Sequence, residues 1–223
     1  MDKNYLKLKD VAQSRGIELF GVADISGIKN NFNISKSLVD KVDKAICLGM
    51  RLSSSILEEI SVQPTRLYLH HYRTVNFSLD QSALEISNII QRDGFRALPI
   101  PASVVLDWDK HTAHLSHRRV AALAGLGWIG RNNLLVSEKL GSQLRLVTIL
   151  TDMPLKTDKP VKGGCGECRL CVDSCPARAI KDAPEEFDRM ACLEKLKGFQ
   201  RQRMIDQYIC GVCVNLCRGP KIN

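Results

Sequence analysis

The chain carries a cysteine run whose spacing strongly restricts how its last third can fold. Cys165, Cys168, Cys171 and Cys175 follow the pattern C-x2-C-x2-C-x3-C, and Pro176 comes next. In bacterial ferredoxin-type runs of this spacing, the first three thiolates bind one [4Fe–4S] cluster and the fourth binds another. A short segment of this kind is organised by its metal clusters more than by a hydrophobic core.

The tail of the chain supplies the remaining ligands for two clusters. Its further cysteines are Cys192, Cys210, Cys213 and Cys217. We predict that one cluster is held by Cys165, Cys168, Cys171 and Cys217, and that the other is held by Cys175, Cys192, Cys210 and Cys213. Zinc knuckles and disulfides are the alternatives, and the ferredoxin-type spacing favours clusters over both. The chain is therefore predicted to transfer electrons.

Composition sets the remaining bounds. A length of 223 residues with 44% hydrophobic content supports one core and a small cofactor-held module. The ninth cysteine, Cys47, lies in a short apolar run and is predicted to be a buried structural thiol. No secretory leader or membrane-spanning apolar run is recognisable, so we expect a soluble protein without a membrane partner. Thiolate-held clusters favour the reducing cytoplasm.

The net charge does not select a partner by itself. The formal charge is +8, and two oxidised clusters with their eight thiolates subtract about four charges, which leaves about +4. A basic surface is compatible with RNA, with an acidic redox partner or with a phosphate-bearing cofactor. The ordinary interpretation is a solvated surface of mixed charge.

The order of predicted elements indicates an α+β fold. A polar, Pro- and Gly-rich link divides the chain into an α+β domain at 1–156 and a ferredoxin-like domain with two [4Fe–4S] clusters at 157–223. Helices are expected at 4–15, 66–92 and 116–124, and strands at 19–23, 45–49, 95–100, 134–137 and 143–150. The last two strands resemble a hairpin, so we expect a mixed or antiparallel sheet.

A glycine loop precedes these two strands. Gly125, Gly127 and Gly130 match G-x-G-x-x-G, but a helix precedes them and a strand follows, which is the reverse of the dinucleotide-binding arrangement. Gly125 fits a helix C-terminus, whereas bare backbone at the other two glycines, beside Trp128, suits the close approach of a large flat ligand. We therefore favour a ligand-contacting loop over a plain turn. Further donors follow at Arg131, Asn132 and Asn133.

This loop and its surroundings resemble the epoxyqueuosine reductases. The stretch 121–135, AALAGLGWIGRNNLL, is similar to the A-G-L-G-W-I-G-K-x-x-L-L block of that family, and 147–155, VTILTDMPL, is similar to its next strand. The cysteine runs match as well. The resemblance, which extends to reductive dehalogenases, implies a nitroreductase-like domain that binds base-off cobalamin beside a two-cluster ferredoxin domain. Electrons would pass through the clusters to cobalt and then to the substrate.

Three departures from the family lead us to expect a different substrate. The chain ends at Asn223, without the helical-repeat tail that family members use around tRNA, and Arg218 stands where a proline often follows the last cysteine. The family's proton-donating Asp aligns with His111, although Asp107 or Asp109 could take that role after a small gap. We therefore expect that the protein is not a tRNA epoxyqueuosine reductase and that tRNA is an unlikely partner.

The histidines at 111, 114 and 117 leave three interpretations open. At positions i, i+3 and i+6 of a helix, the three side chains would not share one face, so they would make a poor zinc site. They suit a polar surface or a first helical turn, or else a functional histidine near cobalt that donates a proton. The predicted function is a cobalamin-dependent reductase that takes electrons from a ferredoxin- or flavodoxin-type donor and reduces a small molecule. The alternative is a non-catalytic electron carrier or an activator of a corrinoid protein.

Overall fold

The computed structural model describes residues 2–107 and 112–219, which form two compact units. The first unit comprises Met1–Met50, Asn76–Leu126 and Arg145–Val161, and the second comprises Arg51–Val75, Gly127–Leu144 and Lys162–Asn223. The predicted boundary at residue 156 lies close to Val161, where the chain leaves the first unit for the last time. The second unit also takes in two earlier segments that the sequence division placed in the first domain. Separate folding of 1–156 and 157–223 stays a prediction.

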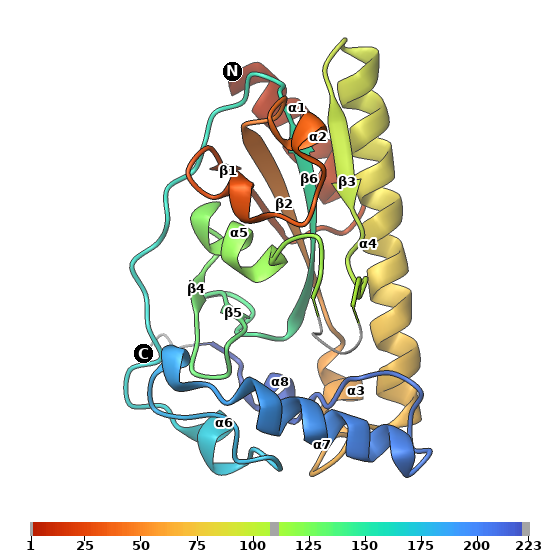
Figure 1. Ribbon diagram of the computed structural model, residues 1–223, viewed down its shortest axis with the longest axis vertical. Helices are drawn as coiled ribbons and strands as arrows, with labels where there is room; N and C mark the ends of the chain where they lie inside the picture. Colours follow the sequence, from red (N-terminus) through yellow and green to blue (C-terminus); the bar gives the residue numbers. More distant parts are fainter. Residues whose placement is uncertain (1, 108–111, 220–223) are drawn as a thin grey trace. The chain divides into compact units, whose positions relative to one another are not determined.

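The first unit is built on a four-stranded sheet with the order β1-β2-β6-β3 (Figure 1). Strand β1 (Leu19–Asp24) pairs antiparallel with β2 (Lys44–Arg51), with Leu19 opposite Gly49. Strand β3 (Ala97–Ile100) pairs antiparallel with β6 (Leu144–Thr151), with Ala97 opposite Thr151. The predicted α+β class with a mixed or antiparallel sheet is confirmed.

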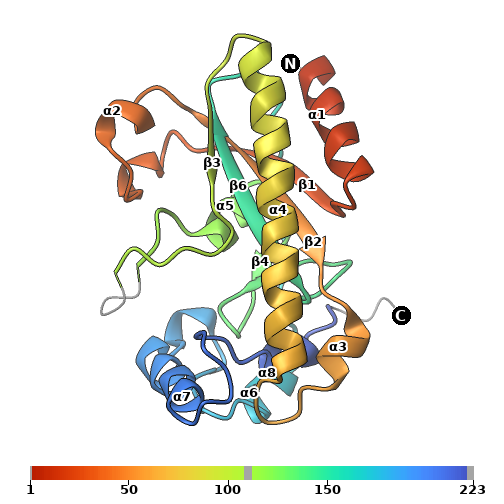
Figure 2. The same cartoon turned by 90° about the vertical axis from the view of Figure 1, so that its right-hand side faces the viewer.

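Helices cover both faces of this sheet (Figures 1 and 2). Phe20 of β1 packs edge-on against Tyr5 of α1 (Asp2–Ser14), with ring centroids 5.2 Å apart. The next residue, Gly21, faces Ala124 at the end of α5 (His117–Leu123). Because successive strand residues point to opposite faces, α1 and α5 lie on opposite sides of the sheet. The short elements η1 (Lys29–Asn31) and α2 (Lys36–Val39) complete the unit.

The longest helix, α4 (Arg66–Arg92), begins and ends at the predicted residues. Its apolar stripe is buried, with exposed fractions between 0% and 8% at Tyr72, Val75, Leu79, Ala83, Ile86 and Ile90. Gly94 follows the helix with φ +86, a conformation that glycine adopts readily at a helix C-terminus. The predicted helix at 4–15 and the predicted strands at 19–23, 45–49 and 95–100 are likewise confirmed, with ends shifted by no more than two residues.

The expected hairpin between residues 134 and 150 is wrong. Strand β5 (Leu135–Val136) pairs instead with β4 (Trp128–Ile129), in a separate two-stranded sheet of the second unit. Strand β6 is buried along almost its whole length and lies in the centre of the four-stranded sheet, where β2 and β3 occupy its two edges. A strand buried on both faces gains more from two neighbours than from one hairpin partner.

The second unit consists mainly of short helices around the cysteines (Figure 1). These are α3 (Ser54–Glu58), α6 (Leu170–Asp173), η2 (Pro184–Glu186), α7 (Arg189–Arg201) and α8 (Val212–Leu216). Helix α8 packs against both α3 and α6. Asp188 caps α7 by accepting a hydrogen bond from the Ala191 amide at 2.9 Å. Within the described ranges, no helix combines the length and the apolar character needed to cross a bilayer.

Candidate metal centre

All eight clustered cysteines lie in the second unit, on short helices and the loops beside them. Cys171 lies on α6, and Cys217 directly follows α8, the helix against which α6 packs. Cys192 and Cys213 lie on α7 and α8, and the remaining four lie in loops at 165, 168, 175 and 210. All nine cysteines of the chain are free thiols, so the disulfide alternative has no support in this structure.

The surroundings of Cys171 bring together the first predicted ligand set. Burial, followed by the neighbouring thiols of Cys217, Cys165 and Cys168, raises the pKa of Cys171 to about 11. Tight turns bring the loop thiols close, because the Cys168 amide donates to the Cys165 carbonyl at 3.0 Å. The neighbours of Cys171 are therefore the three other members of that set.

The second set converges in the same way. Burial, followed by Cys175 and Cys210, raises the pKa of Cys192 to about 11. Burial, followed first by Cys210 and Cys192, raises the pKa of the Cys213 thiol well above its usual range, and Cys171 and Cys175 contribute as well. The Cys213 thiol therefore interacts electrostatically with Cys171 of the first set, which indicates that the two sets are neighbours.

The donors in these two groups are all thiols, which is the ligand type of four-iron clusters. Within residues 2–107 and 112–219, no three His, Cys, Asp or Glu side chains converge closely enough to hold one ion. A tetrahedral zinc site with Zn–S bonds near 2.3 Å needs sulfur atoms about 3.8 Å apart. A [4Fe–4S] cluster spreads its four thiolates wider, because each binds a different corner iron. Two groups of four thiols have the number and type of donors that two such clusters would require.

Cys47 lies outside this arrangement, in the first unit. Its side chain is fully buried on β2, and its sulfur lies 3.7 Å from the Thr148 hydroxyl. Burial raises the pKa of its thiol to about 12. The predicted burial of this thiol is confirmed, and a protonated, enclosed thiol is a poor metal ligand.

Packing inside the protein accounts for the glycines of the loop. Gly125 stops α5 with φ +73, and a Cβ there would lie 2.6 Å from the Lys159 carbonyl oxygen. A Cβ on Gly127 would overlap the Val136 carbonyl oxygen, and one on Gly130 would lie 3.3 Å from the Cys165 sulfur. The role of Gly125 at the helix C-terminus is confirmed. Ligand contact by the loop stays a prediction, and the bare backbone does not require it.

The side chains of the loop are mostly engaged within the second unit. Arg131 binds three main-chain carbonyls, and the buried Asn132 amide donates to the Ser142 hydroxyl at 2.9 Å. Asn133 adopts a left-handed φ of 56 and closes a tight turn onto the Gly130 carbonyl. In the described part of the chain, the buried indole N–H of Trp128 has no hydrogen-bond partner. A buried unpaired donor fits a cofactor acceptor beside it.

The predicted proton-donor segment is only partly described. His111 and Asp109 lie outside the described residues. Asp107 forms an isolated β-bridge with Thr112, and the Thr112 amide donates to the Asp107 main-chain carbonyl at 3.2 Å. His114 Nδ1 lies 3.1 Å from the Asn33 carbonyl oxygen. The roles of all three predicted donors stay predictions.

His117 occupies the first turn of α5 and has a fixed hydrogen-bond pattern. Its Nε2 lies 3.0 Å from the Pro101 carbonyl, which only accepts, so this nitrogen carries the proton. Its Nδ1 then accepts from the Thr148 hydroxyl at 2.8 Å. Burial is the main reason why the pKa of His117 is lowered to about 4. The hydrogen bond to the Pro101 carbonyl raises this pKa, and the positive charge of Arg145 lowers it. His117 is part-buried and is engaged at both ring nitrogens.

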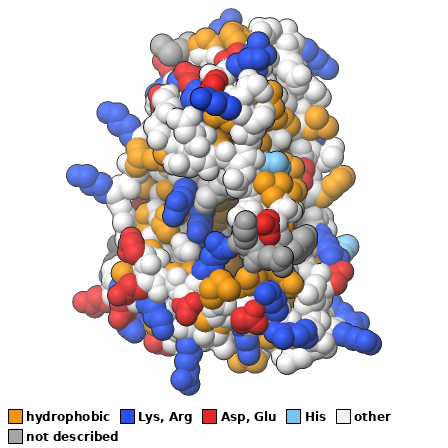
Figure 3. All heavy atoms as spheres, in the orientation of Figure 1, with side chains coloured by type: hydrophobic (Ala, Val, Ile, Leu, Met, Phe, Trp, Pro, Cys, Tyr) orange, Lys and Arg blue, Asp and Glu red, His pale blue; other side chains and the backbone are white. Residues whose placement is uncertain are grey.

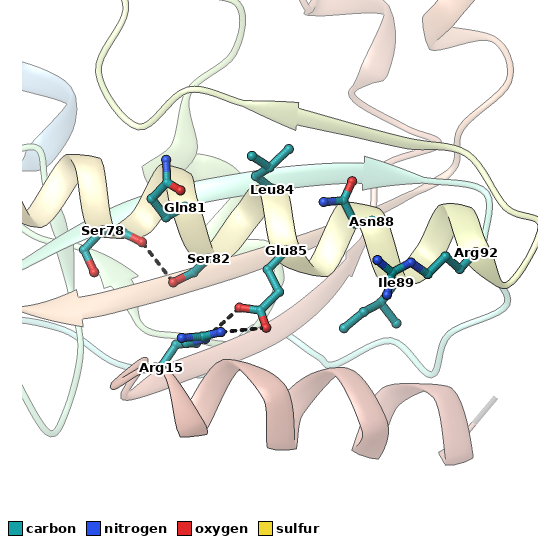
Figure 4. Close-up of a pocket in the computed structure, with 9 residues that line it drawn as sticks. All are labelled: Arg15, Ser78, Gln81, Ser82, Leu84, Glu85, Asn88, Ile89 and Arg92. Carbon is teal, nitrogen blue, oxygen red and sulfur yellow. Dashed lines mark hydrogen bonds and ion pairs between the residues drawn. The ribbon is translucent and has the colours of Figure 1, made fainter.

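A groove of about 560 Å³ lies between α1 and α4 in the first unit (Figure 4). Two of its charged wall residues are paired with each other: Arg15 binds both carboxylate oxygens of Glu85, at 2.7 and 3.0 Å. Ser82 donates to the Ser78 carbonyl of its own helix. Figure 3 shows Lys and Arg side chains spread among Asp and Glu side chains on one face of the molecule. These features agree with a mixed, solvated surface.

Sequence reasoning missed Asp158, which lies in the segment taken for a linker. Its carboxylate accepts from the Tyr5 hydroxyl at 3.0 Å and from the Val22 amide at 2.9 Å, and its own amide donates to the Val22 carbonyl at 2.7 Å. The segment thereby adds to the edge strand β1 of the sheet. No local pattern signals such a long-range pairing.

Comparisons with known proteins place the chain near two groups of reductases. No protein-family model matches it. It is 32% identical over 106 residues to an epoxyqueuosine reductase of Leadbetterella byssophila, a match that covers 44% of this chain and 34% of that one. It is 33% identical over 118 residues to an epoxyqueuosine reductase of Bacillus cereus, covering 49% and 31%. The chain thus matches about a third of the length of these relatives.

Solved structures share the fold over most of this chain. A catabolic reductive dehalogenase in complex with 3-bromo-4-hydroxybenzoic acid has a TM-score of 0.78 at 19% identity, covering 97% of this chain and 32% of that one. A reductive dehalogenase described in terms of B12-dependent dehalogenation has a TM-score of 0.69 at 19% identity, covering 82% and 26%. An epoxyqueuosine reductase with an epoxyqueuosine-modified tRNA stem loop has a TM-score of 0.64 at 19% identity, covering 95% and 64%.

These comparisons correct two expectations from the sequence. The expectations that the chain is not a tRNA epoxyqueuosine reductase and that tRNA is an unlikely partner are wrong, because the sequence relatives carry that name. A protein of the same name and similar fold has been solved with a tRNA stem loop. The expectations rested on the end of the chain at Asn223 and on the residue aligned at position 111, and neither feature selects a substrate.

Proposed function

We propose that this chain is an iron–sulfur reductase of the epoxyqueuosine reductase and reductive dehalogenase type. The convergence of eight thiols into two sets of four, in one unit, is the observation that carries the proposal. In this proposal the second unit is a ferredoxin-like module and the first a nitroreductase-like one. Both clusters need a reducing compartment to assemble, which favours the cytoplasm.

The cysteines hold the clusters and keep them in a partly buried setting. Each thiol must lose its proton to bind iron, and burial disfavours a bare thiolate, so bound iron would stabilise thiolates that are unfavourable without it. The two neighbouring sets of cysteines would hold the clusters close to each other. A low-potential donor protein would supply those electrons one at a time.

A corrinoid is the proposed acceptor of these electrons. When bound, it would supply a strongly reducing cobalt centre for the substrate. Trp128 is the group in the glycine loop whose buried N–H fits an additional acceptor. Asp107, Asp109 and His111 are the proposed sources of a proton for the reduced product. The names of the sequence relatives make epoxyqueuosine in tRNA the first substrate to test.

The first experiment counts iron in anaerobically purified protein. We expect about eight irons and eight sulfides per chain, in two four-iron units. Cys171→Ser should lose one cluster, whereas the matched control Cys47→Ser should leave the iron content unchanged, because Cys47 lies in the other unit. Four irons in the fully loaded wild-type protein would contradict the two-cluster proposal.

The second experiment tests the corrinoid and the substrate. Adding cobalamin should produce a base-off spectrum, and Trp128→Phe should weaken binding while eight irons are retained. Expression in a strain that lacks its own epoxyqueuosine reductase should restore queuosine in tRNA. A base-off spectrum without restored queuosine would point to a different substrate of the same enzyme.

One observation favours a second candidate, an electron-transfer protein or an activator of a corrinoid protein. The glycines, Arg131 and Asn132 of the loop are all accounted for by contacts inside the protein. A protein of this second kind would contain eight irons but leave the spectrum of free cobalamin unchanged at saturating protein concentration. The same titration therefore separates the two functions.

A further inference from the structure

Arg131 uses all three nitrogens of its guanidinium group to bind main-chain carbonyls around the first cysteine loop. Its Nη1 donates to the Cys168 carbonyl at 2.8 Å and its Nη2 to the Gly166 carbonyl at 2.9 Å. Its Nε donates to the Asp182 carbonyl at 2.8 Å. One side chain thus connects the loop that carries Cys165 and Cys168 to the main chain at Asp182.

The backbone of Arg131 is itself held beside the first set. The Gly130 amide donates to the Leu134 carbonyl at 2.9 Å, and the Asn133 amide donates to the Gly130 carbonyl at 2.8 Å. A Cβ on Gly130 would lie 3.3 Å from the Cys165 sulfur. The turn therefore fixes the root of the side chain next to one ligand, and the guanidinium group reaches the backbone of another.

The charge of Arg131 has no carboxylate partner in the described part of the chain, where its polar contacts are the three carbonyls. Other arginines near the same thiols are compensated. Arg218, which follows Cys217, pairs with Glu58 at 3.2 Å, and Arg169 pairs with Asp182 and Asp173. Arg131 therefore contributes a full, permanently positive charge to the surroundings of the first set.

The second set has a weaker counterpart. Lys195 places a positive charge near Cys210 of this set. Lys195 is exposed, however, and its Nζ rests 5.2 Å from the centroid of the Phe199 ring instead of binding the cysteine backbone. Water and salt screen an exposed ammonium more than a guanidinium group fixed by three hydrogen bonds.

We infer that Arg131 is a positioning residue for the first cluster, which it serves by fixing the cysteine loop and by raising the reduction potential of that cluster above that of the second. The inference rests on the proposed two-cluster function. Reduction adds one electron to a cluster, and a fixed positive charge nearby stabilises the added negative charge. Electrons entering at the second cluster would then move toward the first.

The test is a redox titration of anaerobic holoprotein, followed by electron paramagnetic resonance, in the wild type, Arg131→Met and Arg131→Lys. Arg131→Met should make reduction of one cluster about tenfold less favourable, which for a one-electron couple is about 59 mV. The other reduction step should not move. Arg131→Lys should restore most of the shift, yet release iron to a chelator faster than the wild type, because an ammonium group cannot bridge three carbonyls.

Arg218→Met is the matched control, because it removes an arginine that directly follows a ligand but is already ion-paired. It should shift neither step by more than a small fraction of the Arg131→Met effect. Unchanged potentials in Arg131→Met, or equal shifts in the Met and Lys variants, would overturn the inference. If Arg131→Met loads only four irons, the Lys variant decides: a potential at the wild-type value supports the inference, and a lowered one refutes it. A wild-type protein without eight irons would instead refute the proposed function.

Discussion

Lowering the pH from 7 to 5 should destabilise the native protein through one residue of the first unit, His117. Its Nε2–H donates to the Pro101 carbonyl, so Nδ1 is the nitrogen that would take a proton, and protonation there would displace the hydrogen that Nδ1 accepts from the Thr148 hydroxyl. Burial is the main reason why its pKa falls from 6.5 to about 4. Below pH 6.5 the unfolded chain therefore binds a proton that the folded chain excludes.

The size of the effect follows from the two pKa values. Because the folded pKa is the lower one, stability is lost as the pH falls through 6.5, and the loss is complete below about 4. A shift of this size corresponds to about 3 kcal/mol in total, and to about 2 kcal/mol at pH 5. This is a large fraction of the stability of a typical domain.

The assay compares urea unfolding of the wild type and His117→Gln at pH 7 and pH 5, under anaerobic conditions. The loss of unfolding free energy between the two pH values should be smaller by about 2 kcal/mol in the variant. His70→Gln, which removes an exposed histidine of α4 that does not act on His117, should behave like the wild type. A direct titration of the imidazole by nuclear magnetic resonance gives an independent reading. Equal losses in wild type and His117→Gln, or a His117 pKa near 6.5, would refute the reasoning.

Two further substitutions test the packing described above. Gly127→Ala should lower the free energy of unfolding by more than about 1 kcal/mol, because the new Cβ would overlap a main-chain carbonyl oxygen. The control Gly27→Ala should be nearly neutral, because a Cβ there has no atom within 4 Å. Chemical denaturation compares the two variants, and equal midpoints would argue against the overlap. Asp158→Ala should lower the free energy of unfolding by about 1–3 kcal/mol, because two hydrogen bonds to the carboxylate are lost. It should also lower the pKa of Tyr5 below its present value of about 12, which burial and then the hydrogen bond to Asp158 raise. An unchanged titration of the Tyr5 phenol would contradict this cause.

Much of the fold was predictable because its signals are local. The stripe from Tyr72 to Ile90 and the glycine beyond it define α4 to the residue, since helix periodicity and termination depend on nearby side chains. Strand pairing was less accessible. The sequence at 134–150 contains two strands and a turn, but the partner of each strand depends on which edges the rest of the chain leaves open.

The candidate site shows the same contrast. The spacing of the cysteines predicted two ligand sets, and the thiols that surround Cys171 and Cys192 are the members of those sets. The glycine pattern at 125–130 suggested a ligand, whereas the structure supplies a neighbouring protein atom for each of these glycines. A glycine in a sequence indicates that something approaches the backbone, but it does not reveal whether that is a ligand or the protein itself.

The sequence by itself determined eight cysteines at ferredoxin-type spacing, an isolated ninth, and most of the helices and strands around them. Tertiary structure alone decided what the other polar groups do. It brought Arg131 to three main-chain carbonyls around the cysteine loop, and it placed His117 between Pro101 and Thr148. The physical reason is that ligand spacing is a local covalent property, whereas a hydrogen-bond partner is set by segments that meet only after folding.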